Sequence, residues 1–305
     1  MGFELKILGA NSAKPAYNRN QTSQLLTVQN ELFLIDCGEG TQLQLSHYKI
    51  KVSRIKHIFI SHLHGDHFFG LIGLISTMHL QRRATALNLY GPPGLAEIIT
   101  MQLKVSGTVL SYPLHFKEID PEKSRCVFEN DKITIQTIPL IHRIPCMGFL
   151  FREKIKPRRI IKEKIQKEFS LVDMVSLKNG KDIMDENGSV IYKNTDYTLP
   201  PKKSRSYAYC SDTRYHEGII SQIKGVDLLY HEATFLSDRE QRAEETFHAT
   251  ARQAALIAKK AEVGQLLIGH YSSRYRDITP FEAEAKQVFD NTILAIEGET
   301  IYIED

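Results

Sequence analysis

Four apolar segments of this chain end in histidine or aspartate, and this pattern restricts the fold more than any other feature. They cover residues 57–62, 138–142, 206–212 and 265–270. Each is short and bounded by turn-forming residues, as strands usually are. Binding groups tend to converge in loops at the strand ends of a rigid sheet. We therefore expect a sheet whose loops bring these polar side chains together.

Strand-like and helix-like segments are mixed in both halves of the chain, which indicates an α/β fold of packed layers. Further strands are expected at residues 3–9, 23–28, 32–38, 87–92, 133–140, 226–234 and 293–303. Helices are expected at residues 40–49, 94–105, 218–224 and 250–263. The 305 residues suit one large domain or two small ones. Residues 153–203 are rich in Lys, Asp, Asn and Pro, so they are expected to form an insertion.

Composition excludes some classes of protein and leaves others open. The net charge of +3 is too small to identify a nucleic-acid partner by itself. The four cysteines are far apart and form no CxxC pair, so neither a disulfide framework nor a cysteine-based metal site is expected. No signal peptide and no apolar run of membrane-spanning length is recognisable. The chain is therefore expected to be soluble and cytoplasmic.

Histidines and aspartates follow the predicted strands in numbers that indicate metal binding. They are His62, His64, Asp66, His67, His142, Asp212 and His270. Imidazole and carboxylate ligands without cysteine suit Zn²⁺ and related divalent ions. Seven groups exceed the need of one tetrahedral ion, but they can serve two ions if one carboxylate is shared.

Three of these residues have an alternative interpretation when they are taken singly. His142 and His270 can be ordinary hydrogen-bonded or surface histidines, and Asp212 can cap a turn. The SHLHGDH segment at residues 61–67 is different, because it places four polar groups within six positions directly after an apolar strand. That density predicts a metal site.

SHLHGDH is also the signature of the metallo-β-lactamase superfamily, and other segments narrow the resemblance. They are NRN (18–20), DCGEGTQ (36–42), YGPPG (90–94), PPKKSRS (200–206), SDTR (211–214), HEATF (231–235), FHAT (247–250) and HYSSRY (270–275). Over nearly its whole length the chain resembles the short form of the ribonuclease Z family, which cleaves the 3′ trailer from precursor tRNA. The resemblance implies an αβ/βα sandwich, formed as one domain over residues 1–305, with a flexible tRNA-binding arm inserted at residues 153–203.

The resemblance also implies a two-zinc centre, with Mn²⁺ as an alternative metal. One zinc would be held by His62, His64 and His142. The other would be held by Asp66, His67 and His270, and Asp212 would bridge the two.

Catalytic roles are implied for three residues of the resembling segments. Asp66 would ligate a zinc and help to orient or deprotonate the attacking water. His248 would donate a proton to the leaving 3′-oxygen, and Glu232 would hold its imidazole. From the residues alone, Glu232 has an alternative role in capping a turn and His248 in capping the following helix. The products would be a tRNA with a 3′-hydroxyl and a trailer with a 5′-phosphate.

Basic residues in the loops and the arm would contact the substrate. The candidates are Arg19, Asn20, Arg274, Lys156, Arg158 and Arg159. The residues in the loops could instead make surface ion pairs, and the basic run at residues 154–167 could instead be the solvated face of a helix. Binding through the arm cations should weaken with salt. The inserted segment at residues 153–203 lacks the Gly-Pro-rich tip that the arm of this family usually carries. Short forms of the family are homodimers in which one arm serves the partner's active site, and the same is expected here.

Two other functions remain compatible with these motifs. One is a different hydrolase of the same fold, such as another binuclear phosphodiesterase or a thioester hydrolase. The other is a tRNA-binding protein that has lost catalysis, although each ligand that the resemblance requires is present in the sequence.

Overall fold

The computed structural model describes residues 2–165 and 169–304. The chain divides into two compact units. The larger unit contains the residues up to Phe151 together with Ser206–Glu304, and the smaller unit is Arg152–Arg205. The expected candidate metal ligands all belong to the larger unit.

The first sheet of the larger unit combines an antiparallel edge with a parallel half. In spatial order its strands are β18 (Thr300–Tyr302), β1 (Phe3–Gly9), β2 (Ser23–Val28), β3 (Glu31–Ile35), β4 (Ile55–Phe59), β5 (Leu87–Gly91) and β6 (Leu114–Glu118). Strands β3 to β6 run parallel to one another. Their carboxyl ends therefore lie at one edge of the sheet, and the SHLHGDH loop follows β4 at that edge.

The second sheet repeats this design. In spatial order its strands are β17 (Thr292–Leu294), β16 (Gln265–Gly269), β15 (Leu228–Glu232), β14 (Ser206–Cys210), β9 (Cys146–Glu153), β8 (Ile133–Leu140) and β7 (Cys126–Glu129). Strands β14 to β17 are parallel. Ligands of open α/β sheets typically bind outside the carboxyl ends of parallel strands, and Asp212 and His270 follow such ends.

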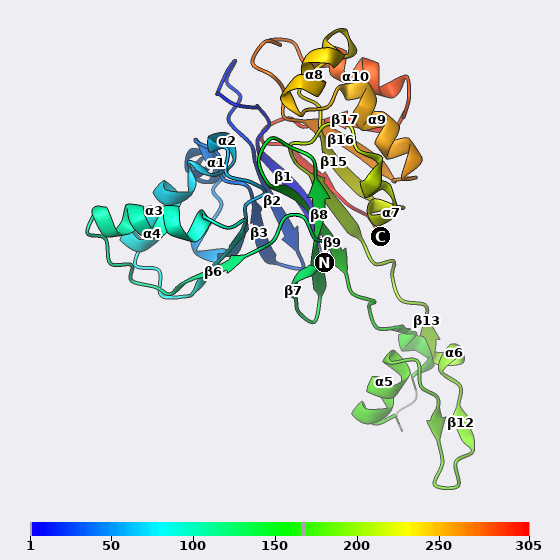
Figure 1. The fold of residues 1–305 in the computed structure, drawn as a ribbon. Coiled ribbons are helices and arrows are strands. Elements are labelled where there is room, and N and C mark those ends of the chain that lie inside the picture. The colour runs from blue at the N-terminus through cyan, green and yellow to red at the C-terminus, as the bar shows by residue number, and fades with distance from the viewer. Residues whose placement is uncertain (1, 166–168, 305) are drawn as a thin grey trace. The chain divides into compact units, whose positions relative to one another are not determined.

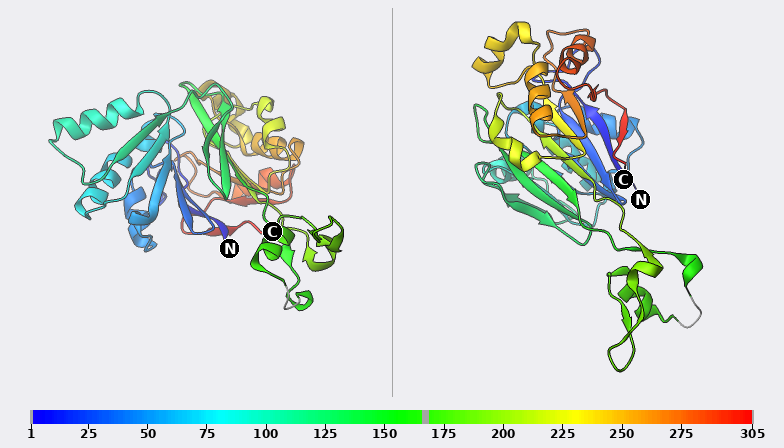
Figure 2. Two further views of the ribbon diagram at one scale, coloured as in Figure 1. Left: turned by 90° about the horizontal axis from the view of Figure 1, so that it is seen from below. Right: turned by 90° about the vertical axis from the view of Figure 1, so that its right-hand side faces the viewer.

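Helices cover the outer faces of the two sheets, as Figures 1 and 2 show for the larger unit. They are α1 (Thr41–His47), α2 (Gly65–Phe68), α3 (Leu71–Leu80), α4 (Leu95–Val105), α7 (Ile220–Ile223), α8 (Glu240–Thr246), α9 (Ala251–Lys260) and α10 (Thr279–Lys286). Short 3-10 helices occur at η1 (Val52–Arg54), η3 (Glu217–Ile219) and η4 (Ser237–Arg239). None of the helices that the structure describes is long and apolar enough to cross a bilayer.

The alternation of side chains along each strand builds two hydrophobic layers. On β4, Phe59 faces the second sheet, where its ring lies 5.3 Å from the ring of Phe149 on β9. Its neighbour Ile58 faces the helices and packs in the layer that contains Leu74 and Ile75 of α3. Because successive strand side chains point to opposite faces, one strand supplies both layers. This arrangement confirms the predicted αβ/βα sandwich.

The smaller unit consists of short elements. They are β10 (Arg159–Ile160), η2 (Lys162–Lys164), α5 (Leu171–Lys178), β11 (Ile183–Met184), β12 (Val190–Tyr192), α6 (Asn194–Tyr197) and β13 (Thr198–Leu199). Ser170 caps α5 in a capping box with Asp173. At the base of the unit the buried carboxylate of Glu153 accepts hydrogen bonds from the guanidinium of Arg205, at 2.8 Å on each oxygen.

The sequence prediction missed several elements. Strand β9 is buried at nearly all of its positions. Its apolar residues therefore do not alternate with polar ones, and this alternation is the pattern that would identify a strand. Helix α3 follows the SHLHGDH loop directly and was not predicted. The single strand expected at residues 293–303 is two strands, β17 and β18, which belong to different sheets.

Candidate metal centre

The SHLHGDH loop is held by close backbone contacts with the turn that follows β3. The backbone N–H of Cys37 donates to the carbonyl of His67 at 2.7 Å, and the N–H of Gly70 donates to the carbonyl of Cys37 at 2.9 Å. A Cβ atom on Gly38 would lie 2.4 Å from the carbonyl oxygen of Asp66, so only glycine fits there. The DCGEG turn thus fixes the backbone that carries the histidines.

The remaining candidate ligands come from the second sheet. His142 follows β8, Asp212 follows β14 and His270 follows β16. Asp212 and His270 are nearly fully buried. The backbone of His270 has a φ of 65°, a conformation that is uncommon for residues other than glycine. This turn directs its ring toward the first sheet's loop, because His270 Nε2 lies 3.3 Å from His67 Nε2.

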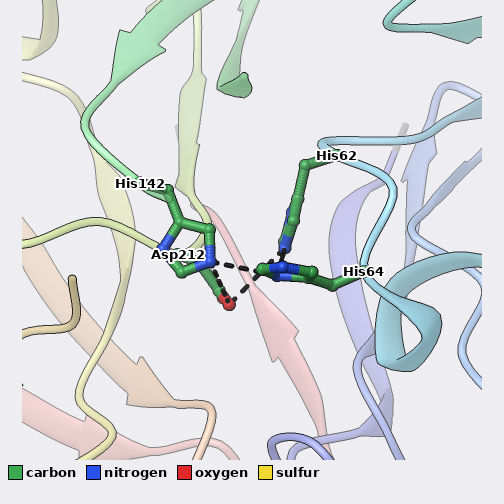
Figure 3. A group of neighbouring side chains, drawn as sticks. All are labelled: His62, His64, His142 and Asp212. Carbon is green, nitrogen blue, oxygen red and sulfur yellow. Dashed lines mark hydrogen bonds and ion pairs between the residues drawn. The ribbon is translucent and has the colours of Figure 1, made fainter. Parts of the chain in front are cut away.

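One group of possible ligands contains His62, His64, His142 and Asp212, shown in Figure 3. His64 Nδ1 lies 3.1 Å from His62 Nε2 and 3.0 Å from His142 Nε2. Oδ2 of Asp212 lies 3.6 Å from His62 Nε2 and 3.7 Å from His142 Nε2. In Figure 3 these nitrogens and the oxygen point toward a common centre.

A second group contains Asp66, His67, His270 and again Asp212. Oδ2 of Asp66 lies 3.5 Å from His67 Nε2 and 3.4 Å from His270 Nε2. Oδ1 of Asp212 lies 3.4 Å and 3.2 Å from the same two nitrogens. The two carboxylate oxygens of Asp212 therefore face different groups, as those of a bridging ligand would.

The spacing of these atoms fits a tetrahedral metal. Four ligands at the usual zinc distance of about 2.0–2.1 Å lie about 3.3 Å from one another. The nitrogen–nitrogen distances in the two groups are 3.0 to 3.3 Å. In addition, Oδ1 of Asp212 is buried and has no hydrogen-bond partner of normal geometry within the described part of the chain. A buried carboxylate oxygen without a partner is costly, and a cation would satisfy it.

The protonation of the histidines also fits metal binding. Burial lowers the pKa of His64 to about 4 and lowers the pKa of His142. These imidazoles are therefore neutral at neutral pH, which a metal ligand requires. Burial opposes charge on His67, yet the carboxylates of Asp212 and Asp66 raise its pKa well above the usual value. Positive charge is favoured at that position, and a divalent ion supplies it.

Partners outside the two groups orient the ligand rings. Asp36 accepts from His67 Nδ1 at 2.7 Å and from the hydroxyl of Ser61 at 2.8 Å. The hydroxyl of Thr234 lies 2.8 Å from His270 Nδ1, and the carbonyl of Phe247 accepts from His142 Nδ1 at 2.9 Å. Such contacts fix which ring nitrogen faces the metal. None of these orienting roles was predictable from sequence, although Asp36 lies within the DCGEGTQ segment.

Replacing Asp36 by asparagine is expected to weaken metal binding by roughly ten- to a hundredfold, because His67 loses its charged acceptor. Competition with a chelator of known affinity measures the change. Asp131→Asn in the exposed β7–β8 turn is a matched control that should bind metal as the unmodified protein does. Equal affinities for Asp36→Asn and the unmodified protein would refute the orienting role.

A second pair of side chains lies beside the metal groups. His248 Nδ1 lies 2.8 Å from Oε1 of Glu232, which is fully buried at the end of β15. The same carboxylate accepts from the backbone N–H groups of Thr234 and Ala249 at 2.9 Å and 3.1 Å. Burial lowers the pKa of His248, but the charge of Glu232 outweighs it, so that the pKa is raised. His248 is thus held in one orientation and favours the protonated form.

One cavity opens onto this centre, and a second cavity lies beside the first. A cavity of about 320 Å³ is lined by His64, Asp66, Asp212, His248 and His270, with Phe69 among its other walls. A cavity of about 510 Å³ adjoins it. Both are lined by Ser12, Ala13, Arg143 and His248. The larger cavity also contains Lys14, Arg242 and Arg274 in its walls and no carboxylate, so it is strongly basic.

The predicted substrate-binding residues lie in different environments. Arg274 lines the basic cavity. Arg19 donates to Asn11 Oδ1 at 3.0 Å and to the carbonyls of Tyr275 and Arg276, and Asn20 is hydrogen-bonded to Glu297. These two residues tie the first loop to the C-terminal region, and their contact with substrate stays a prediction. Arg143 and Lys14 were not predicted, since single cations in loops carry no distinctive sequence signal.

The predicted arm residues have partners within the smaller unit. Lys156 Nζ lies 2.7 Å from Oε2 of Glu153. Arg158 Nε donates to the hydroxyl of Thr198 at 2.8 Å, and Arg159 Nε donates to the carbonyl of Pro200 at 3.1 Å. Their role in binding tRNA stays a prediction.

Comparisons with known proteins agree with this geometry. The chain matches the family model "Anti-Pycsar protein Apyc1" over residues 3–167 and the model "Beta-lactamase superfamily domain" over residues 163–271. It is 52% identical to ribonuclease Z of Cytophaga hutchinsonii, covering 100% of this chain and 97% of the relative.

Solved structures show the same likeness. Human tRNase Z, short form, superposes with a TM-score of 0.73 at 26% identity, covering 99% of this chain and 100% of the other. The metallo-β-lactamase fold protein YhfI from Bacillus subtilis superposes with a TM-score of 0.70 at 18% identity, covering 99% of this chain and 100% of the other, and supports the fold alone. With its metallo-β-lactamase fold and two His/Asp groups suited to metal, the chain belongs to the ribonuclease Z family of metal-dependent hydrolytic endonucleases.

Proposed function

We propose that this chain removes the 3′ trailer from precursor tRNA, leaving a 3′-hydroxyl on the tRNA and a 5′-phosphate on the trailer. The observation that supports this most directly is the combination of two metal-suited groups with a buried Glu232–His248 pair at the same cavity. Family membership supports the RNA substrate.

We propose that two Zn²⁺ ions occupy the centre, with Mn²⁺ as the alternative. His62, His64 and His142 would hold one, Asp66, His67 and His270 the other, and Asp212 both. When bound, such ions lower the pKa of water and stabilise charge on the phosphate. The protein's own contribution is to fix the ligands, and Asp66, which also lines the cavity, would orient the attacking water.

His248 acts on the leaving group in this proposal. Its Nδ1 is held by Glu232, so Nε2 is the atom left to donate a proton. As the bond from phosphorus to the 3′-oxygen breaks, that oxygen takes the proton and becomes the 3′-hydroxyl of the tRNA. Glu232 is a positioning residue that keeps the imidazole oriented and protonated.

The basic cavity is suited to bind an RNA strand beside His248. Lys14, Arg143, Arg242 and Arg274 surround it, and such cations neutralise backbone phosphates. Because it adjoins the first cavity at His248, the strand that ends in the leaving 3′-oxygen is expected to lie there. We propose that Arg19 and Asn20 form the nearby loop that approaches the same strand.

We further propose that the chain acts as a homodimer in the cytoplasm, where precursor tRNA is its substrate. We also propose that residues 153–203 form a tRNA-binding arm that uses Lys156, Arg158 and Arg159. The exposure of Arg159 supports the arm proposal, and Lys156 and Arg158 are half-buried, so that part of each side chain remains accessible. The mass of the particle in solution tests the dimer.

Cleavage of a precursor tRNA with a 3′ trailer tests the proposed function. The expected products are one tRNA ending in a 3′-hydroxyl and one trailer bearing a 5′-phosphate, with the cut mapped to a single nucleotide. A small phosphodiester and a thioester are assayed in parallel. Rapid turnover of either small substrate without cleavage of the precursor would favour another hydrolase of this fold.

A further inference from the structure

Phe69 is an exposed aromatic residue in the wall of the cavity at the metal centre. It lies between α2 and α3, two residues after His67, and 64% of its surface is exposed. It lines the same cavity as His64, Asp66 and His270. A single exposed apolar side chain is common on a protein surface, but this one stands in a cavity whose other functional walls are polar.

The ring of Phe69 is held in place despite its exposure. It lies directly against Gly65, where an added Cβ atom would be 2.2 Å from ring atom Cε2. It also meets the ring of Phe68 edge-on, at 5.0 Å between centroids, and Phe68 is anchored in the core. Gly65 separates the candidate ligands His64 and Asp66, so the absence of a side chain there lets an aromatic ring approach the centre.

The two cavities place Phe69 away from the proposed leaving group. His248 and Arg143 line both cavities, whereas Phe69 lines only the cavity at the metal groups. If His248 protonates the 3′-oxygen, the tRNA strand lies on the His248 side. The nucleotide joined through the 5′-oxygen then extends from the phosphorus into the cavity that Phe69 lines.

We infer that Phe69 is a stacking platform for the base of the first trailer nucleotide. The inference rests on the proposed function and deepens it. Aromatic rings bind successive bases of single strands by stacking, and they accept any base because every base has a π-face. Phe69 would therefore position the scissile phosphate without demanding a particular trailer sequence.

Precursor tRNAs that carry either a normal nucleotide or an abasic residue at the first trailer position test this inference. For the unmodified protein, removal of that base should lower kcat/KM by about tenfold, the effect of losing one base–aromatic stack. For Phe69→Ala the normal precursor should already be cleaved about tenfold more slowly, and removal of the base should cost nothing further. Phe69→Trp should keep the dependence on the base.

Controls separate this inference from the proposed function. Tyr302→Ala removes another aromatic residue, 68% exposed, that lines neither cavity, and it should keep the full dependence on the base. If Phe69→Ala retains the tenfold dependence, the stacking role is wrong while precursor cleavage still stands. If Phe69→Ala instead loses a dependence of kcat/KM on the last base of the tRNA, Phe69 contacts the tRNA strand and the inference is wrong. No cleavage by the unmodified protein would refute the proposed function itself.

Discussion

Replacing Asp212 by alanine is expected to abolish precursor tRNA cleavage, lowering kcat/KM by at least about a thousandfold. Each of its carboxylate oxygens faces a different group of histidines, at 3.2 to 3.7 Å. The variant would therefore lose a ligand from both groups at once. Elemental analysis should find fewer than two divalent ions per chain, and the cleavage assay measures the loss.

Asp131→Ala is the matched control, because Asp131 is exposed in the turn between β7 and β8, at the opposite end of β8 from His142. It should retain both the metal and the activity.

Thermal unfolding gives a readout that does not depend on turnover. A metal at a thousand times its Kd stabilises the fold by about 4 kcal/mol per site, so removing metal from the unmodified protein should lower Tm. The same treatment should change the Tm of Asp212→Ala far less. An Asp212→Ala protein with two ions and normal cleavage would contradict the bridging assignment.

Replacing His248 by alanine is expected to lower kcat for precursor cleavage by about a hundred- to ten-thousandfold, the usual contribution of a positioned general acid. The metal content should not change, because His248 is placed outside the two proposed ligand sets. His115→Ala, an exposed histidine on β6, is the control and should cleave normally.

A substrate with sulfur in place of the leaving 3′-oxygen separates proton donation from other roles of His248. A thiolate is a good leaving group without protonation, so the unmodified protein and His248→Ala should cleave this substrate at similar rates. The expected result is thus a large defect on the natural linkage and a small one on the sulfur linkage. An equal defect on both would mean that His248 binds or positions the substrate instead.

Sequence patterns predicted the layers of this fold well but not every element. Strands β1, β2 and β8 match the predicted segments, because their ends carry clear turn signals. Strand β9 lies inside the second sheet and packs on both faces, so its apolar residues do not alternate with polar ones. Pairing between strands is a long-range property, and no local pattern shows that β17 and β18 join different sheets.

For the candidate site, the residue types were predictable and the contacts were not. The crowding of His62, His64, Asp66 and His67 is visible in seven residues of sequence. The contact between Asp36 and His67 is not, because it joins residues 31 positions apart through a turn that only the folded sheet brings near. Arg143 is likewise recognisable only once the structure places it between the two cavities.

The origin of the ligands has a consequence for how the molecule is held together. In each group some ligands follow a strand of the first sheet and the others follow strands of the second sheet. Each bound ion would therefore act as a removable cross-link between the two sheets, closing loops of many residues. Stripping the metal should loosen the seam at that edge first, and amide exchange should rise there before it rises in the aromatic core.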